Sequence, residues 1–201
     1  MQPSKYRTTP LATALSATPY GVHTRWYVLT GAACVGKTTL LEALAGQGYR
    51  VIPESARAYF DAEQAKGRTL AEIRADDAAL QRAILALQLS YERDLPVNQV
   101  AFLDRAVPDS LTFFRIFGLD PNEVLPHCFH HHYAGVFILD RLPLRRDQTL
   151  GPEDDAASVF LDAWLERDYA SLGYPVVRVP VLSPQERLDF IRDRLLGGVK
   201  R

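Results

Sequence analysis

The chain has 201 residues, 47% hydrophobic and 23% charged, which is ordinary for a globular protein long enough to bury a core. Its formal net charge of −1 excludes a global basic field, so neither nucleic acid nor an anionic membrane is expected as a partner. No apolar run approaches the roughly 20 residues of a membrane span, and the two cysteines form no disulfide framework, so we expect a cytoplasmic setting.

The first 23 residues are interpreted as a flexible tail. Two basic residues precede the stretch 11–17, which is too short and too interrupted by Thr and Ser to be a secretory signal. No internal repeat and no linker follow. Residues 24–201 are therefore predicted to form a single domain.

The domain opens with a phosphate-binding motif. Residues 31–38 match G-x-x-x-x-G-K-[ST], after an apolar run at 26–29 and before an apolar-periodic segment at 40–44. This order predicts a strand, a loop that binds a nucleoside triphosphate, with ATP the default choice, and a helix whose N-terminus adds positive partial charge. Lys37 is expected to reach the β- and γ-phosphates, and the Thr38 hydroxyl to bind Mg²⁺. The expected nucleotide-binding residues are Gly31, Ala32, Ala33, Cys34, Val35, Gly36, Lys37, Thr38 and Thr39.

Predicted strands and helices then alternate. Strands are expected at 49–53, 99–104, 135–140 and 176–179, and helices from 54 to about 66, at 70–95, 107–117, near 121, at 153–172 and after Ser183. Such alternation predicts an α/β fold, with a five-stranded parallel sheet between two layers of helices. The ligand is expected at the carboxyl ends of the strands.

Two acidic residues end predicted strands at that edge. Asp104 closes the apolar strand 99–104, and beside a phosphate loop it is interpreted as a ligand of Mg²⁺. Glu54 follows the strand 49–53 and is a candidate to orient or deprotonate an attacking hydroxyl, with interaction with its own helix dipole as the alternative. Arg57 lies one turn further on and either joins Glu54 at a ligand or pairs with it.

Several arginines are candidates for stabilising transferred phosphate. Arg105 either clamps an anionic group or forms an ordinary ion pair, with Asp109 close by at the start of the next helix. Arg141, Arg145 and Arg146 form a cluster after the strand 135–140 and are interpreted as a catalytic loop, with a solvated basic loop as the alternative.

Two further clusters allow simpler interpretations. Four histidines and Cys128 lie within 127–132, but without a second ligand pair they indicate a helix-to-strand junction rather than a metal site. Phe113, Phe114 and Phe117 have helical spacing typical of core, and the alternative is a wall for a planar substrate, together with Tyr59.

The sequence resembles P-loop nucleoside and nucleotide kinases, and in particular a short ATP-binding family labelled AAA that includes ribosylnicotinamide kinase domains. The resemblance rests on residues 31–39, 53–57, 102–109, 136–140 and 169–180. It implies the strand order 2-3-1-4-5, a lid after the fourth strand, and Glu54, Arg57 and Asp104 facing the acceptor and the metal. The family's lid arginine corresponds to Leu150 here, so either Arg145 or Arg146 replaces it or the lid is weakened.

These observations favour an enzyme that uses ATP and Mg²⁺ to phosphorylate a hydroxyl of a small molecule, such as a nucleoside or a ribosylnicotinamide-like compound. The alternative is a nucleotide-binding regulatory module with weak ATPase or GTPase activity, which the change at Leu150 keeps open. Exposed aromatic side chains after Asp104 are compatible with a homodimer contact. The sequence identifies neither the acceptor nor the oligomeric state.

Overall fold

The computed structural model describes residues 8–12, 18–142 and 152–197. A five-stranded parallel sheet has the order β3-β4-β2-β6-β7, which confirms the predicted strand order. Its strands are β2 (Trp26–Thr30), β3 (Arg50–Ile52), β4 (Ala101–Asp104), β6 (Gly135–Leu139) and β7 (Val176–Val179). In the central register, Val28 of β2 is paired with Leu103 of β4 and with Val136 of β6. All three side chains are buried, as expected for a sheet that is covered on both faces.

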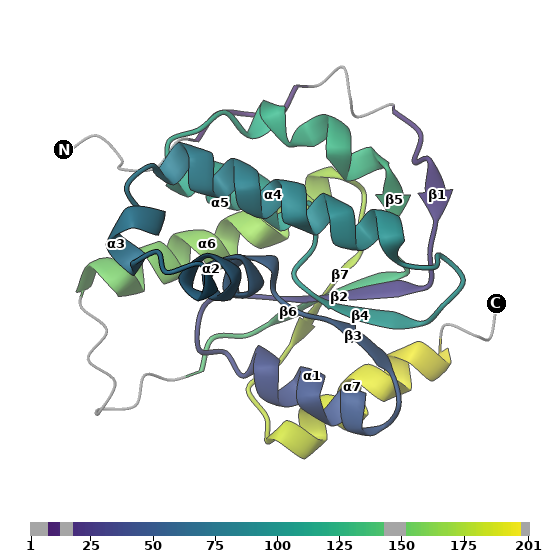
Figure 1. Cartoon of the computed structure of the whole chain (residues 1–201). Coiled ribbons are helices and arrows are strands. Elements are labelled where there is room, and N and C mark those ends of the chain that lie inside the picture. The colour runs from purple at the N-terminus through teal and green to yellow at the C-terminus, as the bar shows by residue number, and fades with distance from the viewer. Residues whose placement is uncertain (1–7, 13–17, 143–151, 198–201) are drawn as a thin grey trace.

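Helices cover both faces of this sheet (Figure 1). Helices α1 (Lys37–Gly46) and α7 (Pro184–Gly197) pack together on one face, and α4 (Asp77–Asp94), α5 (Asp109–Ile116) and α6 (Pro152–Ser171) lie on the other. The predicted three-layer α/β/α architecture is therefore confirmed. No helix within the described ranges is both long and apolar enough to cross a membrane.

The predicted helix over 70–95 is in fact two helices. Helix α2 (Ser55–Ala65) is followed by the short α3 (Leu70–Ile73) and only then by α4. Thr69 and Glu72 form a capping box on α3, and the Asp76 carboxylate accepts a hydrogen bond from the backbone N–H of Ala79 at the start of α4. Two N-cap signals seven residues apart thus start two helices, which the apolar spacing alone did not reveal.

The described residues just before the sheet belong to the folded body and do not form a separate tail. Strand β1 (Val22–His23) pairs in parallel with β5 (His131–His132), and the Tyr20 hydroxyl donates to the carbonyl of Leu172 at 2.7 Å. The expectation of a flexible segment up to residue 23 is therefore wrong for residues 18–23. Residues 1–7 and 13–17 lie outside the described part.

The histidine-rich segment forms the predicted junction. The 3-10 helices η2 (Pro121–Glu123) and η3 (Leu125–Phe129) lead directly into β5. His127 and His131 therefore do not share a helix face, and the described residues contain no group of three or more His, Cys, Asp or Glu side chains arranged to hold a metal.

Candidate active site

The phosphate loop has a backbone that only particular residues tolerate. Gly31 has φ 138°, and a Cβ at this position would lie 2.8 Å from the carbonyl oxygen of Leu139 in the neighbouring strand β6. Gly36 has φ 88° and Cys34 has φ 58°, so the loop turns through left-handed conformations before α1 begins at Lys37. No side chain in the described part of the chain caps this helix. Its first N–H groups are therefore available to an anion.

Lys37 lies inside this loop. Its ammonium donates to the carbonyl oxygen of Ala32 at 3.0 Å and contacts that of Gly31 at 3.4 Å. Burial and the nearby charge of Arg105 lower the pKa of Lys37 to about 8, against the opposing influence of Asp104. The loop carbonyls compensate only in part for the burial of this charge. A bound phosphate would give the Lys37 ammonium an anionic partner.

Asp104 and Thr38 border a cavity of about 200 Å³ that Glu54 and Arg57 also line. Asp104 is buried, and among the described residues its Oδ1 atom has no hydrogen-bond partner. Burial raises the pKa of Asp104 to about 6, because the charges of Lys37 and Arg105 compensate only in part for lost hydration. A carboxylate oxygen and a hydroxyl beside the phosphate loop are the ligand types that Mg²⁺ takes, so these residues fit the metal.

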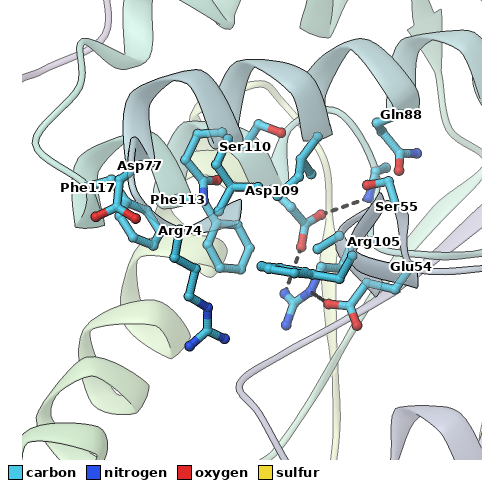
Figure 2. Close-up of a pocket in the computed structure, with 16 residues that line it drawn as sticks. Glu54, Ser55, Arg74, Asp77, Gln88, Arg105, Asp109, Ser110, Phe113 and Phe117 are labelled. Carbon is cyan, nitrogen blue, oxygen red and sulfur yellow. Dashed lines mark hydrogen bonds and ion pairs between the residues drawn. The ribbon is translucent and has the colours of Figure 1, made fainter. Parts of the chain in front are cut away.

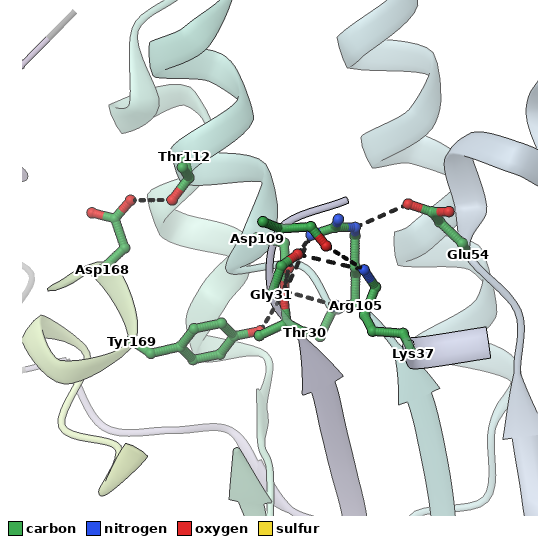
Figure 3. Close-up of polar contacts among 11 residues, drawn as sticks. Thr30, Gly31, Lys37, Glu54, Arg105, Asp109, Thr112, Asp168 and Tyr169 are labelled. Atoms are coloured by element: carbon green, nitrogen blue, oxygen red, sulfur yellow. Dashed lines mark hydrogen bonds and ion pairs between the residues drawn. The ribbon is translucent and has the colours of Figure 1, made fainter. Parts of the chain in front are cut away.

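Arg105 connects two acidic residues, Glu54 and Asp109, by ion pairs. It has φ 68°, an uncommon conformation for a residue with a side chain, and follows β4 directly. Its guanidinium lies 2.9 Å from Glu54 and 3.2 Å from Asp109 (Figure 3). Of the two sequence-based interpretations, the structure supports an ion pair, and it involves Glu54 as well as Asp109.

Asp109 organises the buried side of the site. Its carboxylate accepts from the backbone N–H of Ala106 at 3.0 Å, from the Tyr169 hydroxyl at 2.6 Å, and from the Thr30 hydroxyl. Tyr169 belongs to α6, and Thr30 closes β2, so the partners come from three separate parts of the chain (Figure 3). No local sequence pattern indicates the roles of Thr30 and Tyr169, because only the fold brings them to Asp109.

Glu54 is not used to cap its own helix. It occupies the N-cap position of α2 without a side-chain cap hydrogen bond, and its carboxylate is directed at Arg105 instead. Burial acts to raise the pKa of Glu54, but the charge and hydrogen bond of Arg105 outweigh burial and hold it below its ordinary value. Arg57 lines the small cavity together with Glu54, and its charge helps to lower the pKa of Glu54.

A second cavity, of about 410 Å³, opens on the other side of Glu54. The phenyl rings of Phe60, Phe113 and Phe117 line it, whereas Phe114 is fully buried in the core. Phe114 therefore has the core position that its spacing indicates, whereas Phe113 and Phe117 line a cavity together with Phe60 rather than Tyr59. Figure 2 shows Phe113 and Phe117 across the cavity from Glu54. Its remaining lining residues come mainly from α2, α4 and α5.

One arginine that the sequence analysis did not consider supports the phosphate loop. Arg187 of α7 is buried and donates to the carbonyl oxygens of Val35 at 2.6 Å, Pro180 at 2.9 Å and Asp140 at 3.3 Å. It thus joins the loop to the chain segments after β6 and β7. The expected catalytic residues Arg145 and Arg146, together with Leu150, lie outside the described residues.

The parallel sheet and the phosphate loop define a P-loop nucleotide-binding protein. The family model described as "AAA domain" matches residues 26–187, and the chain belongs to this family. A search of curated proteins finds no match.

Solved structures show which folds are similar. A NadR protein in complex with NR superposes with a TM-score of 0.63 at 21% identity, over 89% of this chain and 51% of that chain. Thymidylate kinase from Ehrlichia chaffeensis gives 0.60 at 11% identity, over 85% of this chain and 97% of that chain. Deoxyadenosine kinase from M. mycoides with bound dATP gives 0.54 at 14% identity, over 85% and 98%. This chain spans about half the length of the NadR proteins that it matches.

Proposed function

We propose that residues 24–201 form one kinase domain that transfers the γ-phosphate of ATP to a hydroxyl group of a small molecule. The observation that carries this proposal is the position of Glu54, which lines both the small cavity beside the phosphate loop and the larger aromatic cavity. A carboxylate at that junction stands where a nucleotide and a second substrate would meet.

On the nucleotide side, the backbone of residues 31–39 and the Lys37 ammonium would bind the phosphates. Thr38 and Asp104 would hold Mg²⁺, which when bound neutralises charge on the phosphate oxygens. Arg187 keeps the loop carbonyl of Val35 in place, and so preserves the loop conformation that phosphate binding requires.

On the acceptor side, Glu54 would accept a hydrogen bond from the attacking hydroxyl and orient its oxygen toward the phosphate. Arg105 holds Glu54 ionised and fixed, and Asp109 fixes Arg105 in turn. The phenyl rings of the larger cavity would exclude water from the acceptor. Phosphoryl transfer depends mostly on positioning of the reactants and on stabilisation of charge, and these residues would contribute to both.

The experiment is ADP release by the purified protein with Mg²⁺-ATP over a panel of nucleosides, nucleotides and vitamin-like alcohols. Controls are reactions without acceptor and the Lys37→Ala variant. The proposal predicts ADP release that depends on one class of acceptor and is lost in the variant. Tight ATP binding without stimulation by any acceptor would instead support a nucleotide-dependent regulatory module.

A further inference from the structure

The carboxylate of Asp109 is enclosed, and both of its oxygens are occupied. The residue is only 2% exposed. Within the described part of the chain, its Oδ1 atom accepts from the Thr30 hydroxyl and from Nη1 of Arg105 at 3.2 Å. Its Oδ2 atom accepts from the backbone N–H of Ala106 at 3.0 Å and from the Tyr169 hydroxyl at 2.6 Å. A carboxylate offers about four lone-pair sites, so these donors leave no room for a further contact.

The guanidinium of Arg105 is shared between two carboxylates. Its Nη1 atom contacts Oδ1 of Asp109 and the Thr30 hydroxyl. Its Nε atom donates to Oε1 of Glu54 at 2.9 Å (Figure 3). An arginine frequently binds both oxygens of one carboxylate through two parallel N–H groups. Arg105 cannot bind Asp109 in that way, because Oδ2 already has its donors, and the Nε–H group therefore remains available to Glu54.

Tyr169 of α6 is the side chain that donates to Oδ2. It is completely buried, and its contact has the short length expected of a hydroxyl that donates to a charged oxygen. Burial and the nearby charge of Asp109 raise the pKa of Tyr169 well above its usual range. The hydroxyl therefore keeps its proton throughout the neutral range and always acts as a donor.

We propose that Tyr169 is a positioning residue for Glu54. By occupying Oδ2 of Asp109, Tyr169 restricts Arg105 to the other oxygen of that carboxylate, and the Nε–H group of Arg105 is thereby directed to Glu54. Without the hydroxyl, Oδ2 is free to turn toward the guanidinium. Arg105 then pairs with both oxygens of Asp109 and withdraws from Glu54. The consequence for turnover rests on the proposed function, which places Glu54 at the attacking hydroxyl.

Two variants separate this arrangement from the packing of α5 against α6. Tyr169→Phe removes the hydroxyl and keeps the ring. Thr112→Val is the matched control, because the Thr112 hydroxyl is also buried between these helices and donates to a carboxylate of α6, that of Asp168, at 2.9 Å. Each variant removes one buried hydrogen bond between the same two helices, so we expect similar losses in Tm. Only Tyr169→Phe frees an oxygen of Asp109.

The direct measurement is the solvent exchange rate of the Arg105 Nε–H group, followed by NMR in the full chain without nucleotide. The signal is assigned by its loss in Arg105→Lys. We expect exchange about tenfold faster in Tyr169→Phe than in the wild-type protein, and close to the wild-type rate in Thr112→Val. An unchanged rate in Tyr169→Phe, or an equal increase in Thr112→Val, would overturn the inference.

Steady-state kinetics provide the second measurement. At saturating acceptor, we expect kcat to fall about tenfold in Tyr169→Phe while KM for ATP stays at the wild-type value, because Glu54 is less well oriented but the phosphate loop is unaltered. Thr112→Val should leave both constants unchanged. An unchanged kcat in Tyr169→Phe, or a rise in KM for ATP equal to the fall in kcat, would contradict a role in positioning Glu54.

These outcomes are separate from those that test phosphoryl transfer, because the exchange rate is a property of the free protein. Faster exchange in Tyr169→Phe, with no acceptor-dependent ADP release by the wild-type protein, would refute the kinase and support the arrangement around Arg105. Acceptor-dependent ADP release by the wild-type protein, with equal exchange rates in Tyr169→Phe and the wild type, would do the reverse.

Discussion

The phosphate loop and the acceptor cavity lie on either side of Glu54, but the chain encodes them in different ways. The loop is a contiguous stretch of nine residues whose glycines and lysine determine its conformation and charge. The cavity collects side chains from α2, α4 and α5, and its polar groups are set by Gln88, Arg105 and Asp109, which have other partners behind them. A site made by one segment can be identified from sequence. A site made by several segments becomes visible only when they pack together.

Replacing Lys37 should have the largest effect. Lys37→Ala removes the one ammonium group within the described loop, and we expect ATP turnover to fall by about 10²- to 10³-fold, as for loss of a single preorganised charge stabiliser. Lys66→Ala is the matched control, since the Lys66 side chain is exposed and forms an ion pair with Glu63 away from the phosphate loop. Near wild-type turnover in Lys37→Ala would show that the loop does not hold the phosphates of the reacting nucleotide.

Glu54→Gln tests the junction between the two regions. Gln retains an oxygen for Arg105 but loses the charge, so we expect acceptor-dependent turnover to fall by about 10²-fold while affinity for ATP changes little. Steady-state kinetics and nucleotide binding measure the two effects separately. Glu123→Gln, which affects only an exposed pair with Arg82, serves as the control. An equal loss of ATP affinity and turnover would place Glu54 in the nucleotide site alone.

Arg187→Met tests whether the conformation of the phosphate loop depends on support from α7. The change removes hydrogen bonds from a charged group to three backbone carbonyls, and we expect ATP affinity to fall by about tenfold, with acceptor affinity unchanged. Arg192→Met removes an exposed arginine from the same helix and should have no effect. If ATP binding survives Arg187→Met intact, the loop keeps its conformation without support from α7.

The pH dependence of kcat/KM for ATP should be bell-shaped. Asp104, with a pKa of about 6, becomes protonated as the pH falls and then no longer offers a carboxylate to Mg²⁺. Lys37, with a pKa of about 8, loses its charge as the pH rises. We therefore expect activity to decline below about pH 6 and above about pH 8, with circular dichroism showing that the fold persists. A flat profile across both limbs would contradict these assignments.

The smallest predicted effect is a change in the free energy of unfolding when Asp104 is replaced. Because the folded-state pKa of Asp104 lies above its ordinary value, its ionisation at neutral pH opposes folding, and this cost is absent at lower pH where the carboxyl is protonated. Asp104→Asn should therefore raise the free energy of unfolding at pH 7 by about 1 kcal/mol, or the Tm by about 2 to 4 °C. A lower Tm would show that attraction to the neighbouring cations outweighs the cost of burying the ionised Asp104 carboxylate.

Much of the fold was predictable from the sequence, since the strands are short apolar runs and the helices have clear periodicity. The order of the strands, however, came from family resemblance. The break between α3 and α4 is set by the helix caps Thr69 and Asp76, and the spacing of the apolar residues does not reveal it. Glu54 and Asp104 could be placed beside the phosphate loop from the sequence, because parallel strands present their carboxyl ends at one edge, and the structure brings them to one cavity there.

The remaining parts of the site have no local signature. Tyr169 lies 60 residues from Asp109 in sequence, and Arg187 lies 152 residues from Val35. Gln88 belongs to a periodic amphipathic helix, where a single polar position indicates nothing by itself. Its place in the wall of the large cavity and its hydrogen bond to Glu92 are visible only in the packed structure.

The most direct test of phosphoryl transfer across Glu54 is the product balance of the reaction. Wild-type protein and Glu54→Gln are incubated with Mg²⁺-ATP and the acceptor of the panel that stimulates ADP release most, and ADP and the phosphorylated acceptor are quantified by mass spectrometry. We predict one phosphorylated acceptor for each ADP in the wild-type protein, and a parallel loss of both products in Glu54→Gln. ADP formed with inorganic phosphate and unmodified acceptor would contradict the account and identify the protein as an ATPase.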